Sequence, residues 1–202
     1  MKILIIGGAG TIGQKVSRQF SMKHEVLIAG RNSGDVVVDI VDSQSIEAMF
    51  KSIGNVDAVV NIAGDAKWAA FDSMTEEDFY IGIKSKLMGQ VNLVRIGQQY
   101  VNVGGSFTLS TGILADHPVA LTSSPALVNG GILSFVKEAF LEMQNGVRIY
   151  LLYSALVEYA VASYEADFRG HNHIPMKKVI NGYVKSVEGK GTGEIIRMYD
   201  NC

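Results

Sequence analysis

The sequence predicts an α/β fold in which a doubly wound, mainly parallel, seven-stranded sheet carries helices on both faces. Two observations lead to this prediction. Seven short runs rich in Val and Ile alternate with helical patterns along the 202 residues. Most of these runs lack polar residues at alternate positions, which is typical of strands buried on both faces of a parallel sheet. The length favours one domain over residues 1–202.

The predicted strands span Lys2–Ile6, Glu25–Ala29, Asp35–Val38, Asp57–Asn61, Ser106–Leu109, Arg148–Leu152 and Glu194–Met198. Only Gly30–Gly34 separates the second strand from the third. A crossover between parallel strands normally takes about a dozen residues. We therefore expect a trimmed unit or a tight loop without a helix at this place.

Helical spacing and end signals predict the first helices. One follows a glycine-rich turn and carries Ile12, Val16 and Phe20 on one face. The next begins at a capping Asp42 or Ser43 and ends at Gly54. A third is expected to be long, Thr75–Tyr100, because Thr75 and Asp78 have the spacing of a capping box.

Two further helices are predicted in the second half of the chain. One spans Ser124–Asn145, with Ser124 as its cap and Pro125 in its first turn. The last carries apolar residues from Met176 to Val187 and ends at Gly189.

Composition excludes several classes of protein. Eighteen basic and 20 acidic side chains give a net charge of −2 without a basic stripe, which is unlike a nucleic-acid-binding protein. The single cysteine, Cys202, excludes an intrachain disulfide. The most apolar stretch, Ile149–Tyr164, contains Glu158 and is shorter than the about 20 residues that a membrane span needs. We expect a cytoplasmic protein that binds neither nucleic acid nor membrane.

The glycine-rich turn predicts a nucleotide site of the Rossmann type. It reads Gly8-x-Gly10-x-x-Gly13, and also Gly7-x-x-Gly10-x-x-Gly13, directly between the first strand and the first helix. Glycine lets the backbone turn sharply and approach a pyrophosphate, whose charge the helix N-terminus stabilises. In this context we expect Gly7, Gly10, Thr11, Ile12 and Gly13 to bind a dinucleotide.

The residues after the second strand predict which dinucleotide is bound. An NAD site usually has an acidic residue there for the ribose hydroxyls, whereas this chain has Gly30-Arg31-Asn32. A hydrogen bond from Arg31 to a 2′-phosphate contributes roughly 1.5–3 kcal/mol. That energy is a preference of about 10- to 150-fold. We therefore expect NADP(H) to be preferred over NAD(H), with Arg31 and Asn32 in its site.

Motifs further along the chain extend this pattern. Asp39-Ile40 follows the third predicted strand, Asn61-Ile62-Ala63-Gly64 the fourth, and Ser110-Thr111 ends the fifth. With these motifs the chain resembles the short-chain dehydrogenase/reductase family over essentially its whole length, as a short atypical member. The resemblance implies that Asp39, with Ile40 beside it, contacts the adenine. It also implies that Asn61, Ala63 and Gly64 line the central part of the cofactor.

The catalytic signature of that family is absent. The family carries Tyr-x-x-x-Lys at the start of the helix after the fifth strand, and this chain has Pro125 and Asn129 at those positions. Proline cannot transfer a proton. Asn129 retains the capacity to hydrogen-bond the ribose but cannot lower the pKa of a neighbour.

Other residues are candidates for the chemistry. Lys86 stands where the family commonly has an asparagine, so it is a candidate source of positive charge in the pocket. Ser110 or Thr111 is expected to polarise the substrate carbonyl, and the spacing leaves both open. Tyr153 and the histidines His117, His171 and His173 are alternative acids, for each of which a structural role is the more ordinary expectation. The His171-Asn172-His173 spacing is poor for zinc, so no metal is expected.

Two functions follow from these residues. The first is an NADP(H)-dependent oxidoreductase acting on a small carbonyl or alcohol. The alternative is a catalytically impaired NADP(H)-binding sensor or partner protein on the same fold. By the resemblance, the helices Thr75–Tyr100 and Ser124–Asn145 form a homodimer or homotetramer interface.

Overall fold

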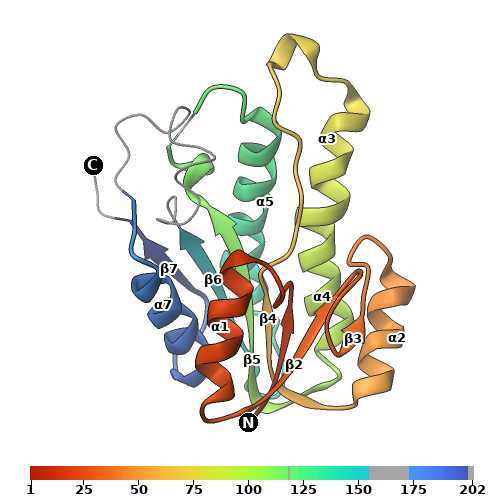
Figure 1. The fold of residues 1–202 in the computed structure, drawn as a ribbon, viewed down its shortest axis with the longest axis vertical. Helices are drawn as coiled ribbons and strands as arrows, with labels where there is room; N and C mark the ends of the chain where they lie inside the picture. The colour runs from red at the N-terminus through yellow and green to blue at the C-terminus, as the bar shows by residue number, and fades with distance from the viewer. Residues whose placement is uncertain (118, 155–172, 200–202) are drawn as a thin grey trace.

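The computed structural model describes residues 1–117, 119–154 and 173–199. Within these residues, a seven-stranded sheet in which every strand pair is parallel forms the centre of the fold (Figure 1). The strand order is β3-β2-β1-β4-β5-β6-β7. The strands are β1 (Lys2–Ile6), β2 (Glu25–Gly30), β3 (Val36–Val37), β4 (Val56–Asn61), β5 (Val101–Gly112), β6 (Arg148–Ser154) and β7 (Glu194–Met198). The predicted fold class is therefore confirmed.

The direction in which the chain winds reverses next to β1. From β1 the chain moves outward through β2 to β3, then returns to β4 on the other side of β1 and continues outward to β7. In open α/β sheets, ligands bind outside the carboxyl ends of the strands at such a switch point. The fold thus places the loops after β1 and β4 side by side.

Helices cover both faces of the sheet (Figure 1). Helices α1 (Thr11–Ser21) and α7 (Met176–Glu188) contact each other on one face. Helices α2 (Ser43–Ile53), α4 (Gly89–Gly97) and α5 (Ser123–Ala139) lie on the other. Asp42 caps α2 by accepting a hydrogen bond from the Gln44 N–H, and Gly54 ends it, as predicted.

The predicted helix Thr75–Tyr100 forms in three stretches. Its capping box is present: Thr75 caps α3 (Glu76–Gly82), and Thr75 and Asp78 each accept a hydrogen bond from the other's backbone N–H. A π-helical turn, Ile83–Met88, follows before α4, which ends at Gly97 rather than at Tyr100. The periodicity of apolar residues does not reveal this π-helical turn, because the turn continues the helix in the same direction from α3 to α4. Such π turns are frequent at functional sites.

Three predicted boundaries are corrected. The cap of α5 is Thr122 rather than Ser124, which is buried within the first turn. The same helix ends at Ala139, before Asn145 and Gly146, which have left-handed φ angles of 55° and 66°. Strand β5 begins at Val101, five residues earlier than predicted, because pairing with Val56 of β4 overrides the turn tendency of Gly104 and Gly105.

The short connection between β2 and β3 is a tight loop, as one of the two predicted forms requires. The Asp35 side chain accepts a hydrogen bond from the Ile28 N–H (2.8 Å), and the Asp35 N–H donates to the Ile28 carbonyl (2.7 Å). Strand β3 has only two residues and forms the edge of the sheet.

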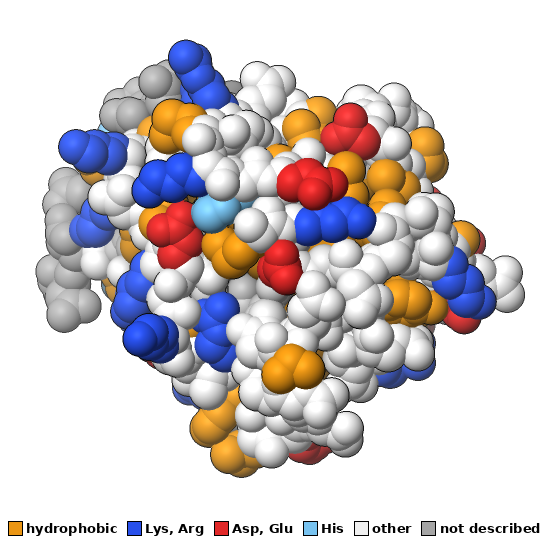
Figure 2. Space-filling view, turned by 90° about the horizontal axis from the view of Figure 1, so that it is seen from below, with side chains coloured by type: hydrophobic (Ala, Val, Ile, Leu, Met, Phe, Trp, Pro, Cys, Tyr) orange, Lys and Arg blue, Asp and Glu red, His pale blue; other side chains and the backbone are white. Residues whose placement is uncertain are grey.

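The core follows the predicted strands. Ile3–Ile6 of β1 and Val59–Val60 of β4 are at most 1% exposed. The face at the amino ends of the strands mixes acidic and basic side chains without a patch of one sign (Figure 2). Among the helices in the described part of the chain, none is long and apolar enough to cross a membrane.

Candidate active site

A groove of about 480 Å³ lies at the switch point between β1 and β4. The loops after β1, β2 and β4, together with the π turn, form its walls. The residues that line it are Ile6, Gly7, Ala9, Gly10, Ala29, Gly30, Arg31, Ser33, Val38, Ile40, Ile62, Ala63, Gly64, Asp65 and Ser85. The structure thus brings together residues that the sequence analysis took from three separate motifs.

The glycine loop is packed too closely for side chains at two positions. A Cβ on Gly13 would lie 2.1 Å from the Gly7 carbonyl oxygen, and one on Gly7 would lie 2.9 Å from the Ala63 nitrogen. Gly7 also has a left-handed φ of 78°. These contacts hold the start of α1 against the loop after β4, and they require glycine.

The first turn of α1 begins at the wall of the groove, because its N-cap, Gly10, lines the groove. Gly10 is the N-cap and has no side chain to satisfy the N–H groups that follow it. The N–H groups of Thr11, Ile12 and Gly13 have no acceptor within the helix. Such an end binds phosphate because the donors and the helix dipole both favour negative charge. These residues therefore fit a pyrophosphate.

A charged pair lies at the rim of the groove. Arg31 Nε is 3.6 Å from Asp39 Oδ2, and both side chains are about half exposed. The Asp39 carboxylate also accepts a hydrogen bond from the Val41 N–H (3.1 Å). Ile40 is buried and lines the groove, whereas Asn32 is exposed and lies outside its lining. A smaller pocket of about 320 Å³ continues from Arg31 toward Glu77, Tyr80, Ile81 and Lys84.

The loop after β4 presses against the π turn. The Asn61 side chain donates to the Ala63 carbonyl (2.8 Å), while its Oδ1 is buried and finds no hydrogen-bond partner in the part of the chain that the structure describes. A Cβ on Gly64, whose φ is 140°, would lie 3.0 Å from the Lys86 Cα. Gly64 therefore allows Lys86 to approach the groove.

Lys86 is an unusual lysine because of this position. Burial lowers the pKa of its amine to about 8, and the nearby Asp65 carboxylate opposes that shift. No ion pair to Lys86 forms within the described ranges. A lysine of this pKa exchanges protons near neutral pH, which is what a general acid requires. A strongly shifted group beside a groove is a functional candidate.

Ser110 and Thr111 point to opposite faces of the sheet. The Ser110 hydroxyl donates to the Asn61 carbonyl (2.5 Å) and lies 2.8 Å from the Tyr183 hydroxyl of α7. The Thr111 hydroxyl lies on the other face and is buried, and it has no hydrogen-bond partner among the described residues. The contacts of Ser110 are internal, so the arrangement favours Thr111 for a role toward a ligand.

Asn129 and Pro125 are buried on the inner face of α5. The Asn129 amide donates to the Gly112 carbonyl at the end of β5 (3.0 Å), and its Oδ1 has no hydrogen-bond partner within the described ranges. Asn129 does not line the groove described above. Tyr153 of β6 is in register with Thr111, and burial raises the pKa of its phenol, so that it keeps its proton.

Several other candidates are placed differently. His117 stacks edge-on against Tyr199 after β7. His171 lies outside the described residues, and His173 is exposed. Within the described ranges, no group of three His, Cys, Asp or Glu side chains gathers to hold a metal ion.

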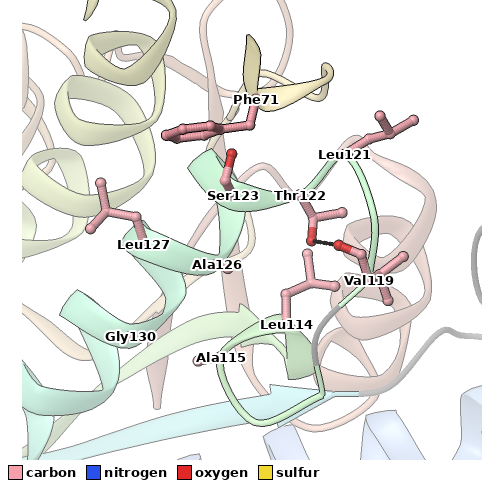
Figure 3. A pocket seen from close by; sticks show the side chains of 10 residues that line it. All are labelled: Phe71, Leu114, Ala115, Val119, Leu121, Thr122, Ser123, Ala126, Leu127 and Gly130. Carbon is pink, nitrogen blue, oxygen red and sulfur yellow. Dashed lines mark hydrogen bonds between the residues drawn. The ribbon is translucent and has the colours of Figure 1, made fainter. Parts of the chain in front are cut away.

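A second pocket, of about 510 Å³, lies on the outer flank of α5 (Figure 3). Its lining is uncharged, with Leu114 and Ala115 below, Leu127 on the helix and Phe71 across the opening. Helical spacing puts Leu127 on the side of α5 opposite to Pro125. The pocket shares no lining residue with the groove, so the two are separate.

Sequence reasoning missed the polar residues that join these parts. Ser85 is buried, lines the groove and accepts a hydrogen bond from the Asp65 N–H (3.0 Å). The sequence shows Ser85 only as a serine within a predicted helix, and this does not distinguish a buried hydroxyl from one exposed to solvent.

Comparisons with known proteins agree with this geometry. A family model described as the RmlD substrate binding domain matches residues 1–88. The crystal structure of the protein lin1944 from Listeria innocua has a TM-score of 0.97 and 41% sequence identity, and the match covers 98% of this chain and 100% of that one. No curated protein matches the chain.

Two other solved structures share the fold. A small-chain dehydrogenase in complex with NADPH matches with a TM-score of 0.88 and 23% identity over 98% of this chain and 96% of its own. A short chain dehydrogenase from Mycobacterium smegmatis matches with a TM-score of 0.83 and 18% identity, over 100% and 92% of the two chains. The sheet, the glycine loop and these likenesses agree on the fold: the chain has the fold of the short-chain dehydrogenases, with Pro125 and Asn129 at the two positions where the resemblance places Tyr-x-x-x-Lys.

Proposed function

We propose that the protein is an NADP(H)-dependent oxidoreductase that interconverts a small carbonyl compound and its alcohol. The observation that carries the proposal is the groove itself. It joins a glycine loop and an uncapped helix end to Arg31, and two of its lining residues, Gly64 and Asp65, lie next to Lys86. The dehydrogenase crystallised with NADPH has the same fold, which supports this choice of cofactor.

Each part of the groove has a proposed role toward the cofactor. Gly7, Gly10 and Gly13, with the N–H groups of Thr11 and Ile12, hold the pyrophosphate. Arg31 and Asn32 hold the 2′-phosphate, and Asp39 and Ile40 hold the adenine. The central part of the cofactor is assigned to Asn61, Ala63, Gly64 and Asn129. The buried, unpartnered Oδ1 atoms of Asn61 and Asn129 fit a polar ligand, because such atoms are costly to leave unsatisfied.

The chemistry is divided between cofactor and chain. When bound, the nicotinamide supplies the hydride for the carbonyl carbon or accepts it back from the alcohol. Thr111 donates a hydrogen bond to the carbonyl oxygen, because its hydroxyl is without a partner, whereas that of Ser110 is engaged. The Lys86 ammonium gives the proton that the oxygen takes up. A positioned acid contributes about 10²–10⁴-fold.

One observation favours the alternative, an NADP(H)-binding sensor or partner protein without turnover. Pro125 stands where the family has its proton-transferring tyrosine, and it is buried in the first turn of α5. Even without this tyrosine, holding the hydride donor against its acceptor accelerates the reaction, with effective molarities of about 10⁵–10⁸ M. We therefore rank the oxidoreductase first.

Fluorescence titrations with NADPH and NADH test the cofactor half of the proposal. We expect saturable binding that is at least tenfold tighter for NADPH. Absence of binding by both would overturn it. The catalytic half is tested by single-turnover oxidation of bound NADPH with 4-nitrobenzaldehyde, ethyl acetoacetate and 9,10-phenanthrenequinone. Tight binding without oxidation by any of the three would favour the sensor.

We also propose that residues 1–202 act as one domain, in the cytoplasm, as a homodimer or homotetramer. Exposed Phe71, Leu121 and Leu127 around the outer pocket of α5 support an assembly. Light scattering after gel filtration measures it. A monomer at micromolar concentration would argue against the assembly without affecting the groove.

A further inference from the structure

Gln90, in the first turn of α4, is a completely buried amide with all its contacts inside the protein. Its Nε2 donates to the Lys86 carbonyl (2.9 Å) and to the Ser110 carbonyl (3.1 Å), and its Oε1 accepts from the Ser110 N–H (2.9 Å). Burying an amide is unfavourable unless it is fully hydrogen-bonded. Three specific bonds to two separate segments indicate a function for this side chain beyond filling the core.

The two hydrogen bonds from Gln90 to the backbone of Ser110 take the place of bonds that a neighbouring strand would make. Strand β5 pairs with β4 as far as Thr108, which is opposite Val60, and β4 ends one residue later at Asn61. Beyond this point the backbone of Ser110 has lost its neighbour on that side. The Gln90 amide offers one donor and one acceptor, which is what a neighbouring strand would offer. The Gln90 amide thereby satisfies the backbone N–H and carbonyl of Ser110 near the end of β5.

The third bond reaches the π turn. Lys86 lies in that turn, and its carbonyl receives the Gln90 side chain. The turn also meets the loop after β4, through the bond from the Asp65 N–H to the Ser85 hydroxyl. The π turn is therefore held from two sides, by the sheet through Gln90 and by the loop through Ser85.

We propose that Gln90 is a positioning residue, whose amide ties the Lys86 turn to the end of β5 and so keeps the Lys86 amine beside the groove. The importance of this placement for catalysis rests on the role proposed for Lys86 above. The placement itself does not depend on that role. It can be measured on the protein without cofactor.

The ionisation of Lys86 reports where its amine lies. Burial lowers the pKa of this amine to about 8 from its ordinary 10.5, and Asp65 is the charged group that opposes the shift. If the turn loosens, the amine reaches water and its pKa rises. At pH 7.5 an amine of pKa 8 is about one quarter neutral, and one of pKa 9 only about 3% neutral. The neutral fraction falls about eightfold.

The test is competitive labelling of lysines with 1-fluoro-2,4-dinitrobenzene across pH 6–11, read by peptide mass spectrometry. Gln90→Met removes all three bonds at similar volume. Gln90→Asn is a milder change that keeps the amide but shortens its reach. Gln98→Met is the matched control, because Gln98 is exposed near the end of the same helix and its amide donates only to the Arg95 carbonyl.

In the Gln90 variants we expect at least fivefold slower labelling of Lys86 at pH 7.5 and a higher labelling midpoint. Gln98→Met should label like the parent protein. A Gln90 variant that melts at a lower temperature but keeps the parent labelling midpoint at Lys86 would overturn the proposal, since Gln90 would then be structural only. If Gln90→Met does not fold, Gln90→Asn decides. Because no cofactor is present, failure here is distinct from failure of NADPH binding.

Discussion

Replacing Gly13 by alanine tests the construction of the glycine loop most directly. The new Cβ would lie 2.1 Å from the Gly7 carbonyl oxygen and 2.8 Å from backbone atoms of Gly8, where an ordinary contact begins near 3.4 Å. Because backbone atoms cannot rotate away, the start of α1 must move by about 1 Å. Overpacking of this kind costs about 1–3 kcal/mol. For a protein of this size we expect the melting temperature to fall by about 2–12 °C.

The same displacement should weaken cofactor binding. It moves the N–H groups at the start of α1, and a lost hydrogen bond to a charged group is worth about 1.5–3 kcal/mol. NADPH binding should therefore weaken by about 10- to 150-fold. Thermal melting followed by circular dichroism measures the first effect, and fluorescence titration with NADPH measures the second.

Gly130→Ala is the matched control. Gly130 lies inside α5, and a Cβ there would meet nothing closer than 4.0 Å. Alanine is the better helix former, so the variant should melt at or above the parent temperature and bind NADPH equally well. If Gly13→Ala behaved like this control in both assays, the close approach of Gly13 to Gly7 would not determine the loop.

Four further substitutions test the remaining roles. Arg31→Ala should weaken NADPH binding about 10- to 150-fold and leave NADH binding unchanged. If titration showed an equal loss of affinity for both cofactors, the proposed contact of Arg31 with the 2′-phosphate would be contradicted. Thr111→Val should abolish carbonyl reduction with little change in melting temperature. Ser110→Ala should instead lower the free energy of unfolding by about 1–3 kcal/mol, because it leaves the Asn61 carbonyl and the Tyr183 hydroxyl without this hydrogen-bond partner. Reduction kinetics measure the first effect, and urea unfolding measures the second. Lys86 holds its proton less tightly in the folded protein, at a pKa of about 8, than in the unfolded chain. Folding stability should therefore rise between pH 8 and 10.5. Lys86→Met should flatten that rise and increase the melting temperature at pH 7, and an unchanged pH dependence would contradict the burial of the amine.

The strands and most helix ends could be predicted because their signals are local. Runs such as Ile3–Ile6 are apolar throughout, and Thr75, Asp42 and Gly54 act within one turn of the chain. The errors fell where a distant contact overrides a local tendency. Gly104 and Gly105 have the composition of a turn but extend β5, because Val101 pairs with Val56 of β4. Ser124 resembles a cap but is buried inside α5.

The candidate site divides in the same way. The glycine loop could be located from the sequence because its glycines lie in one continuous segment with a fixed spacing. The choice between Ser110 and Thr111 could not be made, because adjacent residues of a strand point to opposite faces and only the packed helices distinguish those faces. The structure turns Ser110 toward Tyr183 and leaves Thr111 without a partner.

By itself, then, the sequence determined the fold class, the glycine loop and the absence of a Tyr-x-x-x-Lys pair at Pro125 and Asn129, each of which depends on residues close together in the chain. Only the tertiary structure decided what surrounds Lys86. A lysine within a polar helical stretch is ordinarily solvated, and nothing nearby in the sequence indicates otherwise. Its lowered pKa arises from burial beside Gly64 and from a turn that Gln90 ties to β5, and these contacts exist only once β4, α4 and β5 have packed together.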